Sequence, residues 1–229
     1  MFRKKTEMIA AADALPGRDT PMTVDPTHVV LGTSITPPFP AGMQTIYVAM
    51  GCFWGAERIF WQLDGVHTTA AGYMGGWTKH PTYEETCTAQ TGHTETVMVV
   101  YDPERVTVDQ LMKAFWENHD PTTPNRQGND IGTQYRSAVF TTGDEQHAAV
   151  LASRDRYQRA LSAAGYGTIS TQIDRATDAG DGIFYYAEDY HQGYLHKHPG
   201  GYCNHGFCQV GYDAAAHGQE AAQATLPDA

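Results

Sequence analysis

Hydrophobic positions along the middle of the chain follow two spacings, one typical of strands and one typical of helices. Residues 45–50 form a short apolar run that predicts a strand. Directly after it, apolar side chains recur at helical spacing until Asp64-Gly65, a pair that commonly ends a helix. These helical positions are Phe53, Ala56, Phe60 and Leu63. The pattern therefore predicts a strand that leads into a helix near residue 52.

Three later segments have the pattern of strands, and they are 94–101, 137–141 and 168–174. In the first of these strands a carboxyl group shares one face with apolar side chains. That face carries Glu95, Val97, Val99 and Tyr101. Residues 188–195 are expected to form a short helix.

Two further helices are predicted from capping boxes, in which a hydroxyl and a side chain three residues later cap the first turn. Thr107 with Gln110 opens one helix, and Thr142 with Glu145 opens another that runs to about residue 163. The order of these elements indicates the α+β class. We expect a single two-layer domain with a mixed sheet and helices packed on it, as in ferredoxin-like folds and α-β rolls.

The two ends of the chain lack this periodicity. Prolines interrupt the first 43 residues, and the last residues are rich in alanine, glycine and glutamine. The expected organisation is an N-terminal arm at 1–43, a catalytic α+β domain at 44–200, a cysteine-bearing tail at 201–212 and a C-terminal end at 213–229.

Composition narrows the classes of partner. The formal net charge of the 229 residues is -11, which disfavours binding to nucleic acid or to anionic lipid. The sequence has no apolar run long enough to span a bilayer, and Glu7 and Asp13 interrupt any signal-peptide core. We therefore expect a cytoplasmic protein, and a monomer. Four cysteines are too few for a disulfide-stapled scaffold of this length.

Cys52 is the strongest candidate for chemistry. It lies where the predicted strand ends and the predicted helix begins, and the N–H groups and dipole at a helix N-terminus favour a thiolate. Gly51 and Gly55 allow a tight turn that leaves the sulfur open to an incoming molecule. The alternative for Cys52 is a buried cysteine that only packs, which is the commonest fate of free cysteines.

The residues around Cys52 resemble the signature of the peptide methionine sulfoxide reductase A family. The matching runs begin with Gly51-Cys52-Phe53-Trp54-Gly55-Ala56-Glu57, Gly72-Tyr73-Met74-Gly75-Gly76, Pro81-Thr82-Tyr83 and Gly92-His93-Thr94-Glu95. They continue with Phe115-Trp116-Glu117-Asn118-His119-Asp120-Pro121, Gln127-Gly128-Asn129-Asp130, Gly132-Thr133-Gln134-Tyr135-Arg136-Ser137, Tyr185-Tyr186-Ala187-Glu188-Asp189 and Gly201-Tyr202-Cys203. These runs occur in the family's order, and the arm at 12–17 is similar to the longer bacterial members.

The resemblance implies an enzyme that reduces methionine sulfoxide, with Cys52 as the nucleophile on sulfur. Glu95 matches the family's acid, and a carboxyl group on an apolar strand face is expected to keep its proton near neutral pH. Without the motif, Glu95 would be taken for a solvent-facing residue at a strand edge. Tyr83 and Tyr135 match the phenols that hydrogen-bond the sulfoxide oxygen.

Substrate binding is likewise implied by position in the family's motifs. Phe53 and Trp54 match the aromatic walls that receive the terminal methyl group. Asp130 and His191 match positions that orient the substrate main chain. The resemblance also implies preference for the S epimer, because one enzyme type handles each epimer.

Recycling of the nucleophile is assigned to the tail. Oxidised Cys52 carries a sulfenic acid, with which Cys203 is expected to form a disulfide. The resemblance implies that Cys208 then presents a disulfide to thioredoxin, so no resident cofactor is needed. Only residues 204–207 separate the two tail cysteines, fewer than in the most similar relatives, which leaves the order of exchange open. Cys87 is expected to be a buried spectator.

Two other functions fit parts of the sequence. The first is a zinc-binding module, whose ligands would come from His191, His196, His198, Cys203, His205 and Cys208. It leaves Cys52 without a use. The second is a cysteine hydrolase with a histidine base, which would have no need for Cys203.

Overall fold

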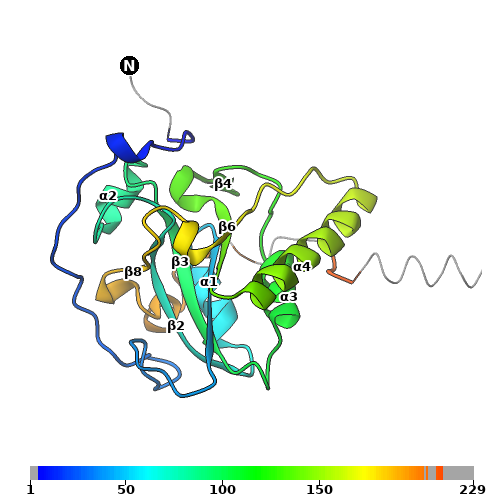
Figure 1. Cartoon of the computed structure of the whole chain (residues 1–229), viewed down its shortest axis with the longest axis horizontal. Coiled ribbons are helices and arrows are strands. Elements are labelled where there is room, and N and C mark those ends of the chain that lie inside the picture. Colours follow the sequence, from blue (N-terminus) through cyan, green and yellow to red (C-terminus); the bar gives the residue numbers. More distant parts are fainter. Residues whose placement is uncertain (1–4, 204, 206–209, 214–229) are drawn as a thin grey trace, which may run out of the picture.

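A mixed six-stranded sheet organises the fold, and the computed structural model describes residues 5–203, 205 and 210–213 (Figure 1). The strand order is β7-β6-β1-β3-β2-β8. The strands are β1 (Gln44–Met50), β2 (Val66–Met74), β3 (Thr94–Tyr101), β6 (Ser137–Thr141), β7 (Gln172–Arg175) and β8 (Tyr185–Tyr186). β4 (Arg126–Gln127) and β5 (Asp130–Ile131) form a separate small hairpin. Only β6 and β7 pair in parallel among these strands of the described chain; the other pairs are antiparallel.

Helices of different lengths connect the strands. They are α1 (Phe53–Trp61), α2 (Tyr83–Cys87), α3 (Val108–Glu117), α4 (Asp144–Ala163) and α5 (Tyr194–Lys197). Short 3-10 turns lie at η1 (Ala11–Asp13), η2 (Thr133–Tyr135), η3 (Ala176–Asp178) and η4 (Asp189–His191). The predicted α+β class with a mixed sheet is confirmed.

One face of the sheet carries the main hydrophobic core. Alternate residues of β1 and β3 point into it, and α1, α3 and α4 cover them with buried aliphatic and aromatic side chains. α3 and α4 lie side by side on one side of the sheet (Figure 1). The largest fully buried side chains of this core include Phe60, Phe115, Trp116 and Tyr157. This core fixes α1, and with it the residues at the start of α1, against β3.

The N-terminal arm covers part of the opposite face of the sheet. Ile35 is buried among Ala70, Met98 and Val100 of β2 and β3, and further arm side chains pack around it. The arm runs around the edge of the molecule remote from α4 (Figure 1). Burying one isoleucine stabilises a fold by about 1.5–3 kcal/mol, so the arm contributes a layer of the structure.

Most predicted boundaries agree with the structure, but one strand start and one helix cap do not. The strand predicted at 168–174 is β7, which begins only at Gln172. The predicted strands at 94–101 and 137–141 match β3 and β6, and the capping box of Thr107 is present. The Thr142/Glu145 capping box is wrong. α4 begins after Gly143, without a side-chain cap. The Thr142 N–H instead donates to Oε1 of Gln146, 2.8 Å away, because Gln146 folds back over the first turn.

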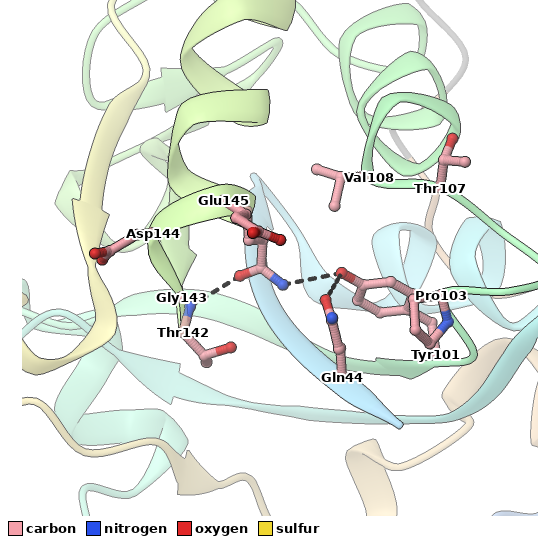
Figure 2. A pocket seen from close by; sticks show the side chains of 10 residues that line it. Gln44, Tyr101, Pro103, Thr107, Val108, Thr142, Gly143, Asp144 and Glu145 are labelled. Carbon is pink, nitrogen blue, oxygen red and sulfur yellow. Dashed lines mark hydrogen bonds between the residues drawn. The ribbon is translucent and has the colours of Figure 1, made fainter. Parts of the chain in front are cut away.

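Gln146 also joins the helix start to the sheet. Its amide nitrogen donates to the hydroxyl of Tyr101 at 3.0 Å and to the carbonyl of Thr45 at 3.1 Å. The Tyr101 hydroxyl in turn donates to the side chain of Gln44 at 2.8 Å. Figure 2 shows the bonds of Gln146 to Thr142 and Tyr101, and that of Tyr101 to Gln44, at the wall of a pocket between the starts of α3 and α4.

Two further segments differ from the sequence-based prediction. β2 was not predicted, because its buried Thr68 and Thr69 and its small residues do not alternate with polar ones. Both of its faces are covered, so the period of two is lost. The predicted helix at 188–195 is two short elements, η4 and α5, separated by Gly193 at φ 60°. None of the described helices is long and apolar enough to cross a bilayer.

Candidate active site

Cys52 occupies the sharp junction between β1 and α1 that the sequence predicts. Gly51 before it has φ 88°, a left-handed conformation that favours glycine, and a Cβ there would lie 2.6 Å from Cβ of Gln127. Cys52 is the N-cap residue of α1 and is 6% exposed. Cys52 lines the pocket described below.

Glu95, a residue of β3, caps the N-terminus of α1. Its Oε2 accepts the N–H of Phe53 at 2.9 Å, although the carboxyl group belongs to β3. Glu95 is 2% exposed. Burial raises the pKa of Glu95 to about 8, while the Phe53 N–H lowers it and Asp130 raises it. The carboxyl group therefore keeps its proton at neutral pH, as expected from its position on an apolar face.

The electrostatics of Cys52 differ from the sequence-based expectation. Burial raises the pKa of the Cys52 thiol well above its usual range, and the Glu95 carboxylate raises it further. The N–H groups of Trp54 and Gly55 lower it, as a helix N-terminus should, but by less. The helix N-terminus thus favours the thiolate as expected, but desolvation outweighs it and the thiol is the favoured form.

A pocket of about 120 Å³ opens over the Cys52 thiol. It is lined by Cys52, Phe53, Trp54, Tyr83, Glu95, Asp130, Tyr135 and Tyr202. Since liquid water occupies about 30 Å³ per molecule, this volume holds a group of a few heavy atoms. Eight residues from five separate segments of the chain therefore meet around one small site.

The two tyrosines predicted from the resemblance both line this pocket. Burial raises the pKa of Tyr83 and of Tyr135, and the Glu95 carboxylate raises both further. Both phenols therefore stay protonated and available as hydrogen-bond donors. The nearby Cys87 also raises the pKa of Tyr83. Cys87, expected to be buried, is half-buried at the end of α2.

The aromatic wall is held from behind by His191. Trp54 stacks on Tyr194 with 3.8 Å between ring centroids, and its indole N–H donates to Nδ1 of His191 at 2.9 Å. The His191 ring also lies 4.9 Å from the ring of Phe53 and 4.7 Å from that of Tyr83. His191 is 0% exposed and is not among the residues that line the pocket. Burial lowers its pKa to about 4, so the ring is neutral.

Tyr202 is a pocket residue to which the sequence analysis gave no role. It is 48% exposed, and its hydroxyl donates to both carboxylate oxygens of Asp130, at 3.2 and 3.3 Å. Burial raises the pKa of Tyr202, and the charges of Asp130, Cys52 and Cys203 raise it further. Tyr202 therefore lies within electrostatic reach of both thiols. Its position next to Cys203 is the feature of the sequence that could have indicated a role at the site.

Cys203 lies against the first turns of α1. A Cβ on Gly55 would be 2.9 Å from its sulfur, and Nη2 of Arg58 donates to that sulfur at 3.1 Å. The structure thus brings Cys203 to the helix that Cys52 caps. His205, which also approaches Gly55, was considered from sequence only as a zinc ligand, and Arg58 was not identified as a site residue. Cys208 lies outside the described residues.

The residues proposed as zinc ligands point into different surroundings. His191 accepts from Trp54, and Nε2 of His205 is bonded to the carbonyl of Met50 at 2.9 Å. His196 and His198 are exposed on α5 and just after it. Within residues 5–203, 205 and 210–213, no three His, Cys, Asp or Glu side chains are grouped as metal ligands would be.

Comparison with known proteins identifies the family. Residues 44–221 match the family model described as peptide methionine sulfoxide reductase. The chain belongs to this family. It is similar to MsrA 1 of Synechocystis, with 54% identity over 92% of each chain, and to MsrA 1 of Caulobacter vibrioides, with 56% identity over 92% of this chain and 96% of the relative.

Solved structures of the family have the same fold. Methionine sulfoxide reductase A of Corynebacterium diphtheriae superposes with a TM-score of 0.80 and 48% identity, covering 86% of this chain and 93% of that one. Reduced Mxr1 of Saccharomyces cerevisiae gives a TM-score of 0.66 at 33% identity, covering 76% and 96%. The family resemblance read from the motifs is confirmed, and with it an oxidoreductase that acts on sulfur.

Proposed function

We propose that this enzyme reduces the S epimer of methionine sulfoxide, free or within proteins, with Cys52 as nucleophile and Glu95 as acid. The observation that carries the proposal is the pairing of these groups at one helix start. Cys52 is the N-cap residue, and Glu95 binds the N–H of the next residue. A pocket for a few heavy atoms lies over both. The bound end of an oxidised methionine has this size and this mixed polarity.

The first step transfers oxygen from the substrate to Cys52. The Cys52 sulfur attacks the sulfoxide sulfur while protonated Glu95 gives its proton to the sulfoxide oxygen. The thiol proton passes to Glu95, so the carboxyl group ends as it began. The protonated oxygen then moves from the substrate sulfur to the Cys52 sulfur while the bond between the two sulfurs breaks. Methionine leaves in the reduced form, and Cys52 is left as a sulfenic acid. Tyr83 and Tyr135 donate hydrogen bonds to the oxygen while it gains charge.

Aromatic side chains bind the rest of the reacting group. Phe53 and Trp54 receive the methyl group, since sulfur and methyl contacts with aromatic rings are favourable. Asp130 binds the substrate main chain. His191 acts as a positioning residue: it accepts the indole N–H of Trp54 and packs on Phe53 and Tyr83 from outside the pocket.

Recycling follows through the tail. Cys203 condenses with the Cys52 sulfenic acid to form a disulfide and release water. Exchange with Cys208 then presents a disulfide to thioredoxin, which supplies the electrons, so no resident cofactor takes part. The position of Cys203 beside Gly55 on α1 supports its choice as the resolving thiol. We place this cycle in the cytoplasm, with a monomeric enzyme.

Turnover on separated sulfoxide epimers, coupled to thioredoxin, tests the proposal. Wild type should reduce the S epimer, and Cys52→Ser should be inactive. Cys203→Ser should release one methionine per enzyme and then stop. Cys87→Ser is the matched control for thiol removal and should keep the full number of turnovers. Activity in Cys52→Ser, or repeated turnover in a Cys203→Ser, Cys208→Ser double variant, would refute it.

A further inference from the structure

A histidine of the tail lies beside the resolving thiol. A Cβ built on Gly55 would be 2.2 Å from Nδ1 of His205 and 2.9 Å from the sulfur of Cys203. Both atoms therefore occupy the space left by the missing side chain of Gly55. The imidazole and the thiol are neighbours in that space, one turn along α1 from Cys52.

The hydrogen bond of His205 determines which of its nitrogens carries the proton. Nε2 lies 2.9 Å from the carbonyl oxygen of Met50, and a carbonyl can only accept. Nε2 must therefore carry the hydrogen, which leaves Nδ1 with a lone pair. Nδ1 is buried and has no hydrogen-bond partner among the described residues. Burial of an acceptor without a partner is costly, by about 1–3 kcal/mol.

Arg58 completes this arrangement from α1. Its guanidinium donates to the Cys203 sulfur at 3.1 Å, on a side chain that stays charged at physiological pH. The Cys203 sulfur thus accepts a hydrogen bond from Arg58 and lies beside Nδ1 of His205, an acceptor that has no partner among the described residues.

From this arrangement we propose that His205 is the general base of the resolving step, with Arg58 positioning the Cys203 sulfur. Nδ1 of His205 takes the thiol proton as Cys203 attacks the sulfur of the Cys52 sulfenic acid. The new S–S bond forms while the S–O bond of the sulfenic acid breaks. The proton on His205 passes to the departing hydroxide, which leaves as water. The inference rests on the proposed role of Cys203.

The surroundings of His205 keep its lone pair available. Burial lowers the pKa of His205 to about 4, and the charge of Arg58 lowers it further, so the ring is neutral at physiological pH. Because such a ring is a weak base, it accepts the proton only during bond formation and returns it at once. Among the described residues, His119, which lies just after α3, also acts on it electrostatically, and burial lowers the pKa of His119 to about 3. His119 therefore stays neutral between pH 6.5 and 9.5.

Single-turnover measurements on the full chain test this inference. Reduced Cys208→Ser protein, in which only Cys203 can resolve Cys52, is mixed with the S sulfoxide of N-acetylmethionine without reductant. Methionine release is followed by chromatography, and disulfide formation by mass spectrometry after an acid quench. The test variant is His205→Gln, whose amide still donates to the Met50 carbonyl. The matched control is His196→Gln, which removes an exposed histidine of the same region.

His205→Gln should release methionine at the rate of the control but form the disulfide at least ten-fold more slowly at pH 7, since general bases contribute about 10²–10⁴-fold. The deficit should shrink as the pH rises to 9.5, because hydroxide then removes the thiol proton. A normal disulfide rate, or a deficit that is constant with pH, would overturn the role of His205. Absence of methionine release from the Cys208→Ser parent, or disulfide formation after Cys203→Ser, would instead refute the proposed function.

Discussion

Replacing Glu95 by glutamine should make the protein more stable while it removes activity. Oε1 of a glutamine can still accept the N–H of Phe53, so the cap of α1 is kept. What is lost is the ionisable group. The wild-type carboxyl group is buried, and its pKa is raised by burial from 4.5 to about 8. The fold therefore binds a proton that the unfolded chain releases.

The size of the effect follows from this difference in pKa. A group with a raised folded pKa gives its full contribution to stability below its unfolded pKa and loses it as the pH rises to the folded pKa. Each pH unit in between is worth about 1.4 kcal/mol. The free energy of unfolding of Glu95→Gln relative to wild type should therefore increase by about 4 kcal/mol between pH 5 and pH 9 and level off above about 8.

Urea unfolding of both proteins at a series of pH values measures this difference. Glu104→Gln is the matched control, because Glu104 is exposed; its difference from wild type should not change with pH. Turnover of Glu95→Gln at pH 7 should fall by about 10²–10⁴-fold, since the acid is gone. A stability difference that does not vary with pH would contradict the raised pKa. Turnover within a few-fold of wild type would contradict the role of Glu95 as acid.

Other variants test other parts of the structure. Gly55→Ala puts a methyl group into the space of Cys203 and His205, so disulfide formation should slow at least ten-fold while the first methionine is released normally. In the control Gly143→Ala, where nothing lies within 4 Å of the new methyl group, both rates should equal those of wild type. Tyr202→Phe removes the hydrogen bond to Asp130, worth about 0.5–1.5 kcal/mol, and should lower KM by about two- to ten-fold in steady-state assays, with kcat unchanged; an unchanged KM would mean that substrate does not displace this bond. Ile35→Ala should cost about 2–5 kcal/mol in urea unfolding. Exposed Val30→Ala should cost little, and equal losses in the two variants would contradict the arm's contribution to the core.

The sequence predicts best those elements that bury one face and have a polar capping residue at one end. α3 is such an element: its apolar residues repeat with one period, and Thr107 marks its start. β3 is buried on both faces, but its many β-branched residues still identify it as a strand. β2 could not be found in this way, because the arm covers its second face and the contact is more than 30 residues away along the chain. Long-range cover of this kind leaves no periodic trace.

The residues of the site also differ in how well the sequence predicts them. Cys52 and Glu95 are recognisable because each sits at a fixed place in a regular element, a helix start and a strand face. The neutral state of the thiol was not predictable, because it depends on how deeply the pocket is buried. The sequence did not indicate Arg58, and it indicated His205 only as a zinc ligand. The positions of both residues depend on contacts between the tail and the β1–α1 region, about 150 residues apart along the chain.

The arm over the second face of the sheet also has a consequence for synthesis on the ribosome. The carbonyl of Ile35 accepts the hydroxyl of Tyr186, 151 residues later, and the N–H of Asp25 donates to Asp189, 164 residues later. At about 5–20 residues per second, the partners of the arm emerge roughly 8–30 s after the arm itself. Throughout that interval, its apolar side chains have no completed surface to cover. The first segment of the chain to be made is therefore among the last to reach its final position.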